Sequence, residues 1–574
     1  MRKQKKMQEL KCPWINFYGD KPAHLNYFDG TIYEYLEACS RMHLDLNAYE
    51  YYGKIVNYRK FLMEIEEVAK ALKVQGINEG DRVTICMPNT PQGVLMFYAV
   101  NKIGAVANMI HPLSSESEIE FYLKKSNSKC ILTLDLLYNK VLSVIENTNV
   151  EKIIVTSVSD RMSLKVGMLY WVTKGRKNKK AKLRSCDYTW TDFINKGKTY
   201  VGETLVRRRS NDEAVILYSG GTTGEPKGIL LSNMCFNALA LQAKTMATPN
   251  APGDSILCIM PIFHGFGLGV CIHTTLCIGM KCILIPSFSS KKFGDLIHQY
   301  KPNFIVGVPT LLSALIANKK VAKQDLSFIK NIVCGGDQLQ PNLRRELENF
   351  LIKHGTNAKV KEGYGLTEST AAVCLTLDDY MRPCSIGVPF PDTYFKIVKP
   401  NTHDEVPYGE DGEICISGPT VMLGYLDDVE ETINTLRTHE DGRLWLHTGD
   451  IASMDEDGFV YFKQRLKRVI VSSGYNIYPS YVERVINSHP AVLTSTVIGI
   501  KHPYKVQVAK AFIVLKEGIK PTNDLKNDIY EYCLKNIARY SMPYEIEYRE
   551  TLPTTKVGKV AYRELEKEEE NKEK

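Results

Sequence analysis

Apolar positions follow two alternating patterns up to Cys334. From Phe61 to Leu72 they recur every three or four residues, a spacing typical of an amphipathic helix. The short run Arg82–Met87 is largely apolar and follows turn residues, which predicts a buried strand. The same patterns predict further helices at 94–103, 115–127, 295–300 and 310–317, and further strands at 105–110, 129–134, 304–308 and 330–334. This alternation indicates an α/β fold with parallel sheets covered by helices.

The pattern changes near residue 385, where short apolar runs are separated by Gly- and Asp-rich turns. This pattern of short strands and turns predicts a small β-barrel or a distorted sheet. Beyond Gln464 a compact α+β pattern follows, with strands predicted at 468–471, 491–500 and 509–516 and helices at 479–488 and 527–536. We therefore expect a large N-terminal domain at 1–464 and a small C-terminal domain at 465–574. The first 50 residues are predicted to be irregular, and the last dozen, rich in Glu and Lys, to form a frayed tail.

Composition supports a globular protein of several domains. The chain has 574 residues, of which 44% are hydrophobic and 24% charged. The net charge of +8 comes from the segment 161–184, which holds nine Lys or Arg residues and no acid. The other residues sum to about −1, so the sequence does not predict nucleic-acid binding, which needs a broader basic patch.

Two interpretations of the basic segment 161–184 stay open. Leu164, Met168 and Val172 recur at roughly helical spacing, with cations on both sides. Such an amphipathic element can rest on an anionic membrane, where each cation contributes about 1 kcal/mol. It can equally be a solvated surface insertion. The first interpretation would place the protein peripherally at the inner membrane face.

Fifteen cysteines without a C-x-x-C pair indicate a reducing cytoplasm. Four of them, Cys258, Cys271, Cys277 and Cys282, lie in apolar sequence and are expected to be buried small hydrophobes. The basic N-terminus is not followed by an apolar run, so we expect no secretory signal there. The segment Ser255–Met280 has no charged side chain, but its Pro, His and Gly residues favour buried strand, loop and helix over a membrane span.

The strongest chemical signal is the segment Tyr218–Gly228, which holds four glycines, three aliphatic hydroxyls and one lysine between two apolar runs. Glycines allow backbone N–H groups to converge on an anion, and the lysine adds positive charge. The segment therefore predicts a turn between strands that binds a polyphosphate. It is not a Walker A motif, because Glu225 and Pro226 precede Lys227 and Gly228 follows it.

This loop resembles the phosphate loop of the adenylate-forming superfamily, which includes acyl-CoA synthetases, luciferases and peptide-synthetase adenylation domains. The resemblance implies an N-terminal domain that binds ATP and a mobile C-terminal domain. It also implies that Thr222 contacts Mg²⁺ and takes part in catalysis. The loop residues that the resemblance assigns to ATP are Ser219, Gly220, Gly221, Thr222, Thr223, Gly224 and Lys227.

Gly363–Glu368 resembles the second motif of that superfamily. The resemblance assigns Tyr364 to the adenine face, Thr367 to the α-phosphate and Glu368 to Mg²⁺, for which a carboxylate is a suitable hard ligand. Gly365 belongs to the same turn. Another short motif, Cys334–Asp337, follows a predicted strand and is expected to approach adenine through Gly336 and Asp337.

Two further motifs resemble those that bind ribose and drive adenylation. Trp445–Asp450 ends in a carboxylate that can accept hydrogen bonds from a vicinal diol, and Arg465 resembles a second contact to ribose or phosphate. Pro553–Lys559 resembles the element whose lysine, here Lys559, reaches the α-phosphate and the attacking carboxylate.

Substrate class is indicated by Phe263 and His264, which stand where amino-acid-activating relatives carry Phe-Asp. The resemblance places His264 between an acyl pocket and a thiol tunnel, and counts it among the catalytic residues with Thr222, Glu368 and Lys559. Gly474 is expected to approach the pantetheine arm of coenzyme A, and Lys467 matches the hinge. Val471 stands where luciferase-like members carry lysine, which argues against oxygenation.

These motifs occur in the order of the superfamily over nearly the whole chain. They imply an ATP-dependent acyl-CoA synthetase that acts on a carboxylic acid, of medium- or long-chain fatty type, with Mg²⁺ and coenzyme A. An alternative is a ligase that loads the acyl group onto the phosphopantetheine thiol of a carrier protein. A third possibility is a membrane-bound scaffold without activity, although Lys559, Glu368 and Asp450 are all present.

Overall fold

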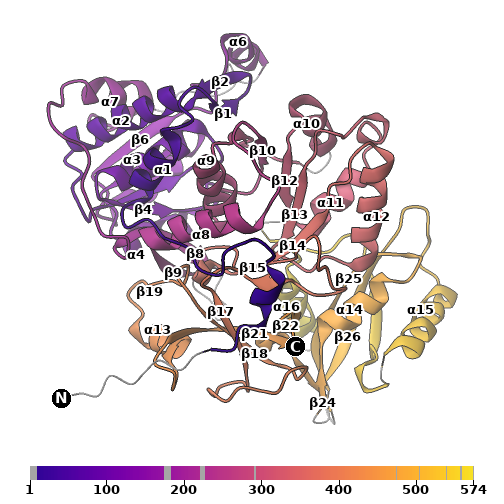
Figure 1. Cartoon of the computed structure of the whole chain (residues 1–574). Coiled ribbons are helices and arrows are strands. Elements are labelled where there is room, and N and C mark those ends of the chain that lie inside the picture. Colours follow the sequence, from indigo (N-terminus) through magenta and orange to yellow (C-terminus); the bar gives the residue numbers. More distant parts are fainter. Residues whose placement is uncertain are drawn as a thin grey trace, which may run out of the picture.

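The computed structural model describes residues 10–173, 182–219, 226–289, 292–472, 475–502, 505–537, 539–555 and 559–572. Two large sheets and their helices make up the first part of the chain, a small antiparallel sheet follows, and a fourth sheet belongs to the C-terminal part (Figure 1). The predicted α/β fold is therefore confirmed.

The first large sheet has eight strands in the order β19-β9-β8-β4-β3-β5-β6-β7. Strands β8, β4, β3, β5, β6 and β7 are parallel to one another, whereas β9 pairs antiparallel with β8, and β19 with β9, at one edge. The bounds are β3 (Arg82–Cys86), β4 (Val106–Met109), β5 (Cys130–Leu134), β6 (Lys152–Thr156), β7 (Tyr188–Thr189), β8 (Glu213–Ser219), β9 (Lys227–Ser232) and β19 (Gly424–Tyr425).

The second large sheet has nine strands in the order β16-β15-β14-β13-β12-β10-β11-β1-β2. Its central strands are parallel, from β14 to β1. The bounds are β1 (Asn47–Tyr51), β2 (Lys54–Asn57), β10 (Ser255–Cys258), β11 (Lys281–Leu284), β12 (Phe304–Gly307), β13 (Asn331–Gly335), β14 (Val360–Tyr364), β15 (Cys374–Leu375) and β16 (Val388–Pro389).

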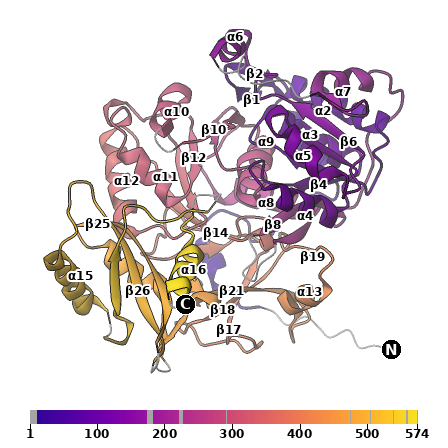
Figure 2. The same cartoon turned by 180° about the vertical axis from the view of Figure 1, so that it is seen from behind.

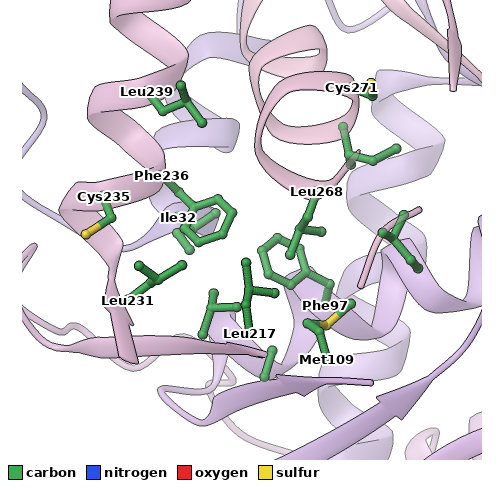
Figure 3. Close-up of a cluster of buried hydrophobic side chains, with 14 of the residues drawn as sticks. Ile32, Phe97, Met109, Leu217, Leu231, Cys235, Phe236, Leu239, Leu268 and Cys271 are labelled. Atoms are coloured by element: carbon green, nitrogen blue, oxygen red, sulfur yellow. The ribbon is translucent and has the colours of Figure 1, made fainter. Parts of the chain in front are cut away.

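Helices cover and connect these sheets. Every residue of α3 is buried, in keeping with its almost continuous apolar sequence. Figure 3 shows Phe97 of α3, Phe236 of α8 and Leu268 of the π-helix η4 in one apolar cluster beside Leu217 of β8. The bounds are α1 (Ile32–Ser40), α2 (Tyr58–Val74), α3 (Pro91–Lys102), α4 (Glu116–Ser126), α5 (Tyr138–Ile145), α6 (Leu164–Thr173), α7 (Trp190–Gly197), α8 (Asn233–Met246), η4 (Phe266–Thr274), α9 (Thr275–Ile278), α10 (Phe293–Tyr300), α11 (Pro309–Ile316), α12 (Pro341–Lys353) and α13 (Val429–Thr435).

The small third sheet is antiparallel and contains β17, β18, β20, β21 and β22. The long strand β21 pairs with β20 through its first residues and with β22 through its last ones, while β18 lies along it as a further partner. The bounds are β17 (Tyr394–Val398), β18 (Gly412–Ser417), β20 (Leu436–Thr438), β21 (Leu444–Met454) and β22 (Val460–Arg465).

The C-terminal part has its own sheet and its own apolar core. The long hairpin β25–β26 pairs with β23 and β27, and helices α14, α15 and α16 accompany it (Figure 2). The bounds are β23 (Ile470–Ser472), β24 (Tyr475–Ile477), α14 (Pro479–Asn487), β25 (Val492–His502), β26 (Val506–Leu515), α15 (Asn523–Asn536), β27 (Glu545–Tyr548) and α16 (Tyr562–Lys572).

Two predictions about the ends of the chain are wrong. Helix α1 and strand β1 lie within the first 50 residues, and a capping box between Thr31 and Glu34 begins α1. The expected frayed tail is helix α16, because Leu565 packs on Ile498 and Phe512. The segment is charged and has a single apolar position, so its sequence shows no apolar periodicity that would predict a helix.

The expectation for the uncharged segment 255–280 is confirmed. It folds as β10, η4 and α9, and the four cysteines named above are buried free thiols. Within the described ranges, every helix is too short or too polar to span a bilayer.

Replacing Leu565 with Ala tests the docking of α16. The cavity should lower the free energy of unfolding by about 2–5 kcal/mol, because Leu565 is fully buried. Leu493→Ala is the matched control, because Leu493 lies on β25 of the C-terminal sheet and is 60% exposed. This variant should change the free energy of unfolding by less than about 0.5 kcal/mol. Urea unfolding of both variants provides the measurement. Equal effects would contradict the packing of α16.

Candidate active site

The phosphate loop lies in a β-hairpin, as expected from the flanking apolar runs. Strands β8 and β9 are antiparallel, and Ser219 is opposite Lys227. Five of the predicted ATP contacts fall outside the described residues: Gly220, Gly221, Thr222, Thr223 and Gly224. The described part of the hairpin therefore positions Ser219 and Lys227 at the base of the loop.

Lys227 has two partners that sequence reasoning missed. Its ammonium forms an ion pair with Glu431 of α13 and lies 5.0 Å from the centre of the Tyr425 ring. Tyr425 belongs to β19, which pairs with β9. The only sequence signal was the dipeptide Gly424-Tyr425, which is too short to interpret without the pairing of β19 with β9.

Tyr425 also links the lysine to Glu368. Its hydroxyl donates a hydrogen bond to Glu368 Oε1 at 3.2 Å. Glu368 lies in the turn after β14, and burial raises the pKa of its carboxyl group, while the Tyr425 hydrogen bond and Arg465 oppose that rise. A half-buried carboxylate with so few compensating cations suits a bound divalent ion.

The turn before Glu368 requires glycine. A Cβ on Gly365 would lie 1.5 Å from the carbonyl oxygen of Ala371. Gly265 is equally constrained, since its Cβ would lie 1.7 Å from the carbonyl oxygen of Thr370. The β14 turn and the start of η4 therefore pack backbone to backbone, which brings Thr367 and His264 into one region.

Tyr364 and Asp450 are joined directly. The Tyr364 hydroxyl donates to Asp450 Oδ2 at 2.8 Å, and its ring packs against Phe395 and Phe462. Asp450 Oδ1 accepts no hydrogen bond from the described residues but lies 3.5 Å from Nε of Arg465. These two residues are opposite each other in the β21–β22 pair. Oδ1 is thus a buried carboxylate oxygen with no hydrogen-bond donor among the described residues, next to the guanidinium of Arg465.

Gly336 and Asp337 follow directly after β13. Gly336 has φ +81°, a conformation that favours glycine. Asp337 is exposed to solvent, and its Oδ1 accepts a hydrogen bond from the backbone N–H of Gln338 at 2.9 Å. These residues face the C-terminal domain, because a Cβ on Gly336 would lie 3.5 Å from Cε of Lys559.

Lys559 therefore lies beside the N-terminal motif that contains Gly336. Its backbone N–H donates to Thr555 Oγ1 at 3.2 Å, which holds the end of the segment. Burial and the nearby Arg465 lower the pKa of the Lys559 ammonium, and Asp337 and Asp450 oppose this shift. A cation in this environment is best stabilised by a ligand that brings negative charge.

His264 lies two residues before the start of η4. Its Nδ1 accepts a hydrogen bond from the backbone N–H of Phe266 at 3.2 Å. Burial, and after it the charge of Lys559, lower the pKa of His264 to about 4. The imidazole is therefore neutral at neutral pH and is suited to orient an uncharged or anionic group.

The structure thus brings together most of the described predicted residues: His264, Gly336, Asp337, Tyr364, Gly365, Thr367, Glu368, Asp450, Arg465 and Lys559. Lys467 lies in the single turn η8 (Leu466–Arg468) that follows β22. The adjacent Arg468 forms a 2.6 Å ion pair with Glu483 of α14. Gly474 lies outside the described residues.

Two family models match the chain. Residues 36–426 match the AMP-binding enzyme model, and residues 481–559 match the model of the AMP-binding enzyme C-terminal domain. A long-chain-fatty-acid–CoA ligase of Bacillus subtilis (strain 168) is 33% identical over 98% of this chain and 99% of its own length. A protein of the same name from Salmonella typhimurium is 31% identical over 97% of this chain and 98% of its own.

Solved structures show the same fold. An anthranilate CoA ligase, AuaEII, in complex with anthranoyl-AMP has a TM-score of 0.81 at 24% identity, over 96% of this chain and 99% of that one. ATP-bound MatB from Rhodopseudomonas palustris has a TM-score of 0.80 at 23% identity, over 94% of this chain and 98% of that one.

The position of Lys559 can be tested through His264. Lys559→Met should raise the pKa of His264 above its value of about 4, because the ammonium repels the imidazolium form. Burial should still keep this pKa below 6.5. The measurement is a pH titration of the His264 NMR signal in protein with labelled histidine, assigned by its loss in His264→Gln. Lys520→Met, which removes an exposed ammonium of the same domain, is the control. An unchanged pKa in Lys559→Met would contradict the proximity.

Proposed function

The chain belongs to the AMP-binding enzyme family, and we propose that it is an ATP-dependent acyl-CoA ligase for fatty acids. The observation that carries the proposal is the position of Lys559. This C-terminal residue lies beside Gly336 and within electrostatic reach of Asp337, Asp450 and His264, so both parts of the chain contribute to one group of residues. Relatives named long-chain-fatty-acid–CoA ligase over nearly the full chain support the same activity.

In the first step an oxygen of the substrate carboxylate attacks the α-phosphorus of ATP. The bond from that phosphorus to the bridging oxygen breaks, and pyrophosphate leaves with the electron pair. The substrate is already an anion, so no general base is required. The obstacle is repulsion between two anions, and Lys559 and Lys227 supply the positive charge that offsets it.

We assign the nucleoside to the N-terminal residues of this group. Asp450 Oδ1, with no described hydrogen-bond donor, is suited to accept from the ribose hydroxyls, and Arg465 lies beside it. Tyr364 and Gly336 are assigned to the adenine. Glu368 and Thr222 would hold Mg²⁺, and the ion would supply charge neutralisation at the phosphates.

In the second step the thiol sulfur of coenzyme A attacks the acyl carbonyl carbon. The bond to the AMP oxygen breaks, AMP leaves, and the thiol proton passes to solvent. We propose that the C-terminal domain, beginning at Arg465, rotates about Lys467 and withdraws Lys559 between the steps. A cavity of about 350 Å³ lies between the start of α12 and α14. His264 and Gly474 are assigned to the thiol side.

The alternative acceptor of the acyl group is the thiol of a carrier protein. The chain length of the acid is a second property that an experiment has to determine. ATP–pyrophosphate exchange with a series of saturated acids, followed by detection of the CoA thioester, separates the possibilities. We expect exchange with long-chain acids and a CoA thioester. Exchange without thioester would favour the carrier protein, and the absence of exchange with every acid would overturn the ligase activity.

Lys559→Ala should separate the two half-reactions. We expect adenylation to fall by about 100- to 1,000-fold, because the residue is assigned to charge formed in that transition state. Thioester formation from supplied acyl-AMP should be nearly unchanged. Lys520→Ala is the matched control, because Lys520 is an exposed lysine of the same domain. Single-turnover assays of each step provide the measurement, and equal loss in both steps would refute the assignment.

We also propose that α6 contacts the membrane. This helix projects at the top of Figure 1, and its exposed apolar side chains include Met168 at 69% and Val172 at 51% exposure. The basic residues of 161–184 adjoin it in the sequence. Apolar side chains that enter the lipid boundary and cations that meet anionic head groups would act together.

The membrane proposal predicts the behaviour of a double variant. Met168→Glu with Val172→Glu should reduce sedimentation with anionic vesicles, since it adds two negative charges and removes the apolar contact. Activity on a soluble short-chain acid should stay constant. Met42→Glu is the control, because Met42 is 88% exposed and lies outside α6. Undiminished vesicle binding by the double variant would leave α6 a solvated surface helix.

A further inference from the structure

Three histidines of the third sheet converge outside the candidate active site. His403 lies in the turn after β17, His439 in the hairpin between β20 and β21, and His447 on β21. One ring nitrogen from each lies within 4.8 Å of the others. His439 and His447 are buried, whereas His403 is exposed to solvent. The cluster is therefore shielded from solvent at His439 and His447 and accessible to solvent at His403.

The distances suit a tetrahedral metal ion. The Nε2 atoms of His439 and His447 are 2.9 Å apart. At a metal–nitrogen distance of about 2.0–2.1 Å, two ligands of a tetrahedral zinc ion lie about 3.3 Å apart. Coordination thus requires only a small separation of this pair and a rotation of the exposed His403. Its ring already stacks on His439, with centroids 4.2 Å apart and an interplanar angle of 15°.

A second interaction orients His447 for coordination. Its Nδ1 lies 3.1 Å from Glu413 Oε2. A proton on Nδ1, donated to this carboxylate, leaves the lone pair on Nε2, which faces His439. A carboxylate behind a histidine is the usual arrangement at protein zinc sites, where it fixes the tautomer and raises the basicity of the ligand.

His439 offers to the ion its Nε2, which faces Nε2 of His447 at 2.9 Å. Its Nδ1 is buried and has no hydrogen-bond partner among the described residues. The nearest ammonium, Lys396, is compensated by ion pairs of 2.9 Å with Asp441 and 3.1 Å with Glu405.

We propose that His403, His439 and His447 bind one divalent transition-metal ion, with Zn²⁺ as the fitting ion and water as the fourth ligand. Imidazole nitrogen is a preferred zinc ligand, and three histidines with one open position form a known coordination set. This inference does not depend on the proposed ligase activity.

The site would connect to the ribose region through Glu413. Its other carboxylate oxygen, Oε1, accepts the backbone N–H of Gly449 at 2.9 Å, and Gly449 precedes Asp450. A metal ion that holds His447 would therefore also hold the segment that carries Asp450. Metal binding should raise the melting temperature of the full-length protein.

The test uses the full chain after treatment with a chelator. Titration with Zn²⁺, followed by calorimetry and by thermal melting, should show one equivalent bound and a higher Tm. His403→Ala is the main variant, because its exposed position spares the fold. His439→Gln is the second. Both should bind Zn²⁺ at least about 10- to 100-fold more weakly and lose the Tm shift.

The exposed His298→Ala is the matched control and should bind as the wild type does. Substitution with Co²⁺ should give a tetrahedral visible spectrum without a thiolate charge-transfer band, which excludes binding by cysteines. Zinc binding that is unaffected in both His403→Ala and His439→Gln would overturn the proposal, as would the absence of saturable binding by the wild type.

Discussion

Charge compensation among a few neighbouring side chains is the constraint on which the candidate site depends. Burial raises the pKa of the carboxyl groups of Glu368 and Asp450 and lowers that of the Lys559 ammonium, so each charged form needs an opposite charge nearby. Two cations from different parts of the chain meet that need: Arg465 at the end of β22, and Lys559 of the C-terminal part. A bound nucleotide would add negative charge near the cations, and its metal ion would add positive charge near the carboxylates. Ligand binding would therefore stabilise the docked position of the C-terminal domain.

The sheets explain how distant segments reach this site. Parallel strands β13 and β14 end at Gly335 and Tyr364, and ligands of α/β proteins characteristically bind at the carboxyl ends of such strands. The hairpin β8–β9 brings Lys227 from the other large sheet, and β21 brings Asp450 from the small one. Gly265 and Gly365 then let two backbone turns approach so closely that any side chain would clash. The large apolar core contains side chains from both large sheets, and it therefore fixes the positions of these strand ends relative to one another. Figure 3 shows part of this core.

Much of the fold and most of the described site residues could be predicted from the sequence, because their signals are local. Helical and strand periods identified α2, β3, α3 and β4, and short motifs identified Tyr364, Asp450 and Lys559. Contacts between distant residues could not be predicted. Nothing near Lys227 in the sequence points to Glu431, and His403, His439 and His447 become a cluster only through the strand pairing. Helix α16 was missed because tertiary packing of one leucine, rather than a periodic pattern, stabilises it.

We propose that the acyl-adenylate binds between the N-terminal motifs and Lys559 of the C-terminal part. A crystal structure of the protein with a non-hydrolysable acyl sulfamoyl adenosine tests it most directly. The account predicts that Asp450 accepts hydrogen bonds from the ribose, that Lys559 contacts the sulfamoyl group, and that the acyl chain extends past His264. Binding of the analogue elsewhere, or with Asp450 and Lys559 both remote from it, would contradict the account.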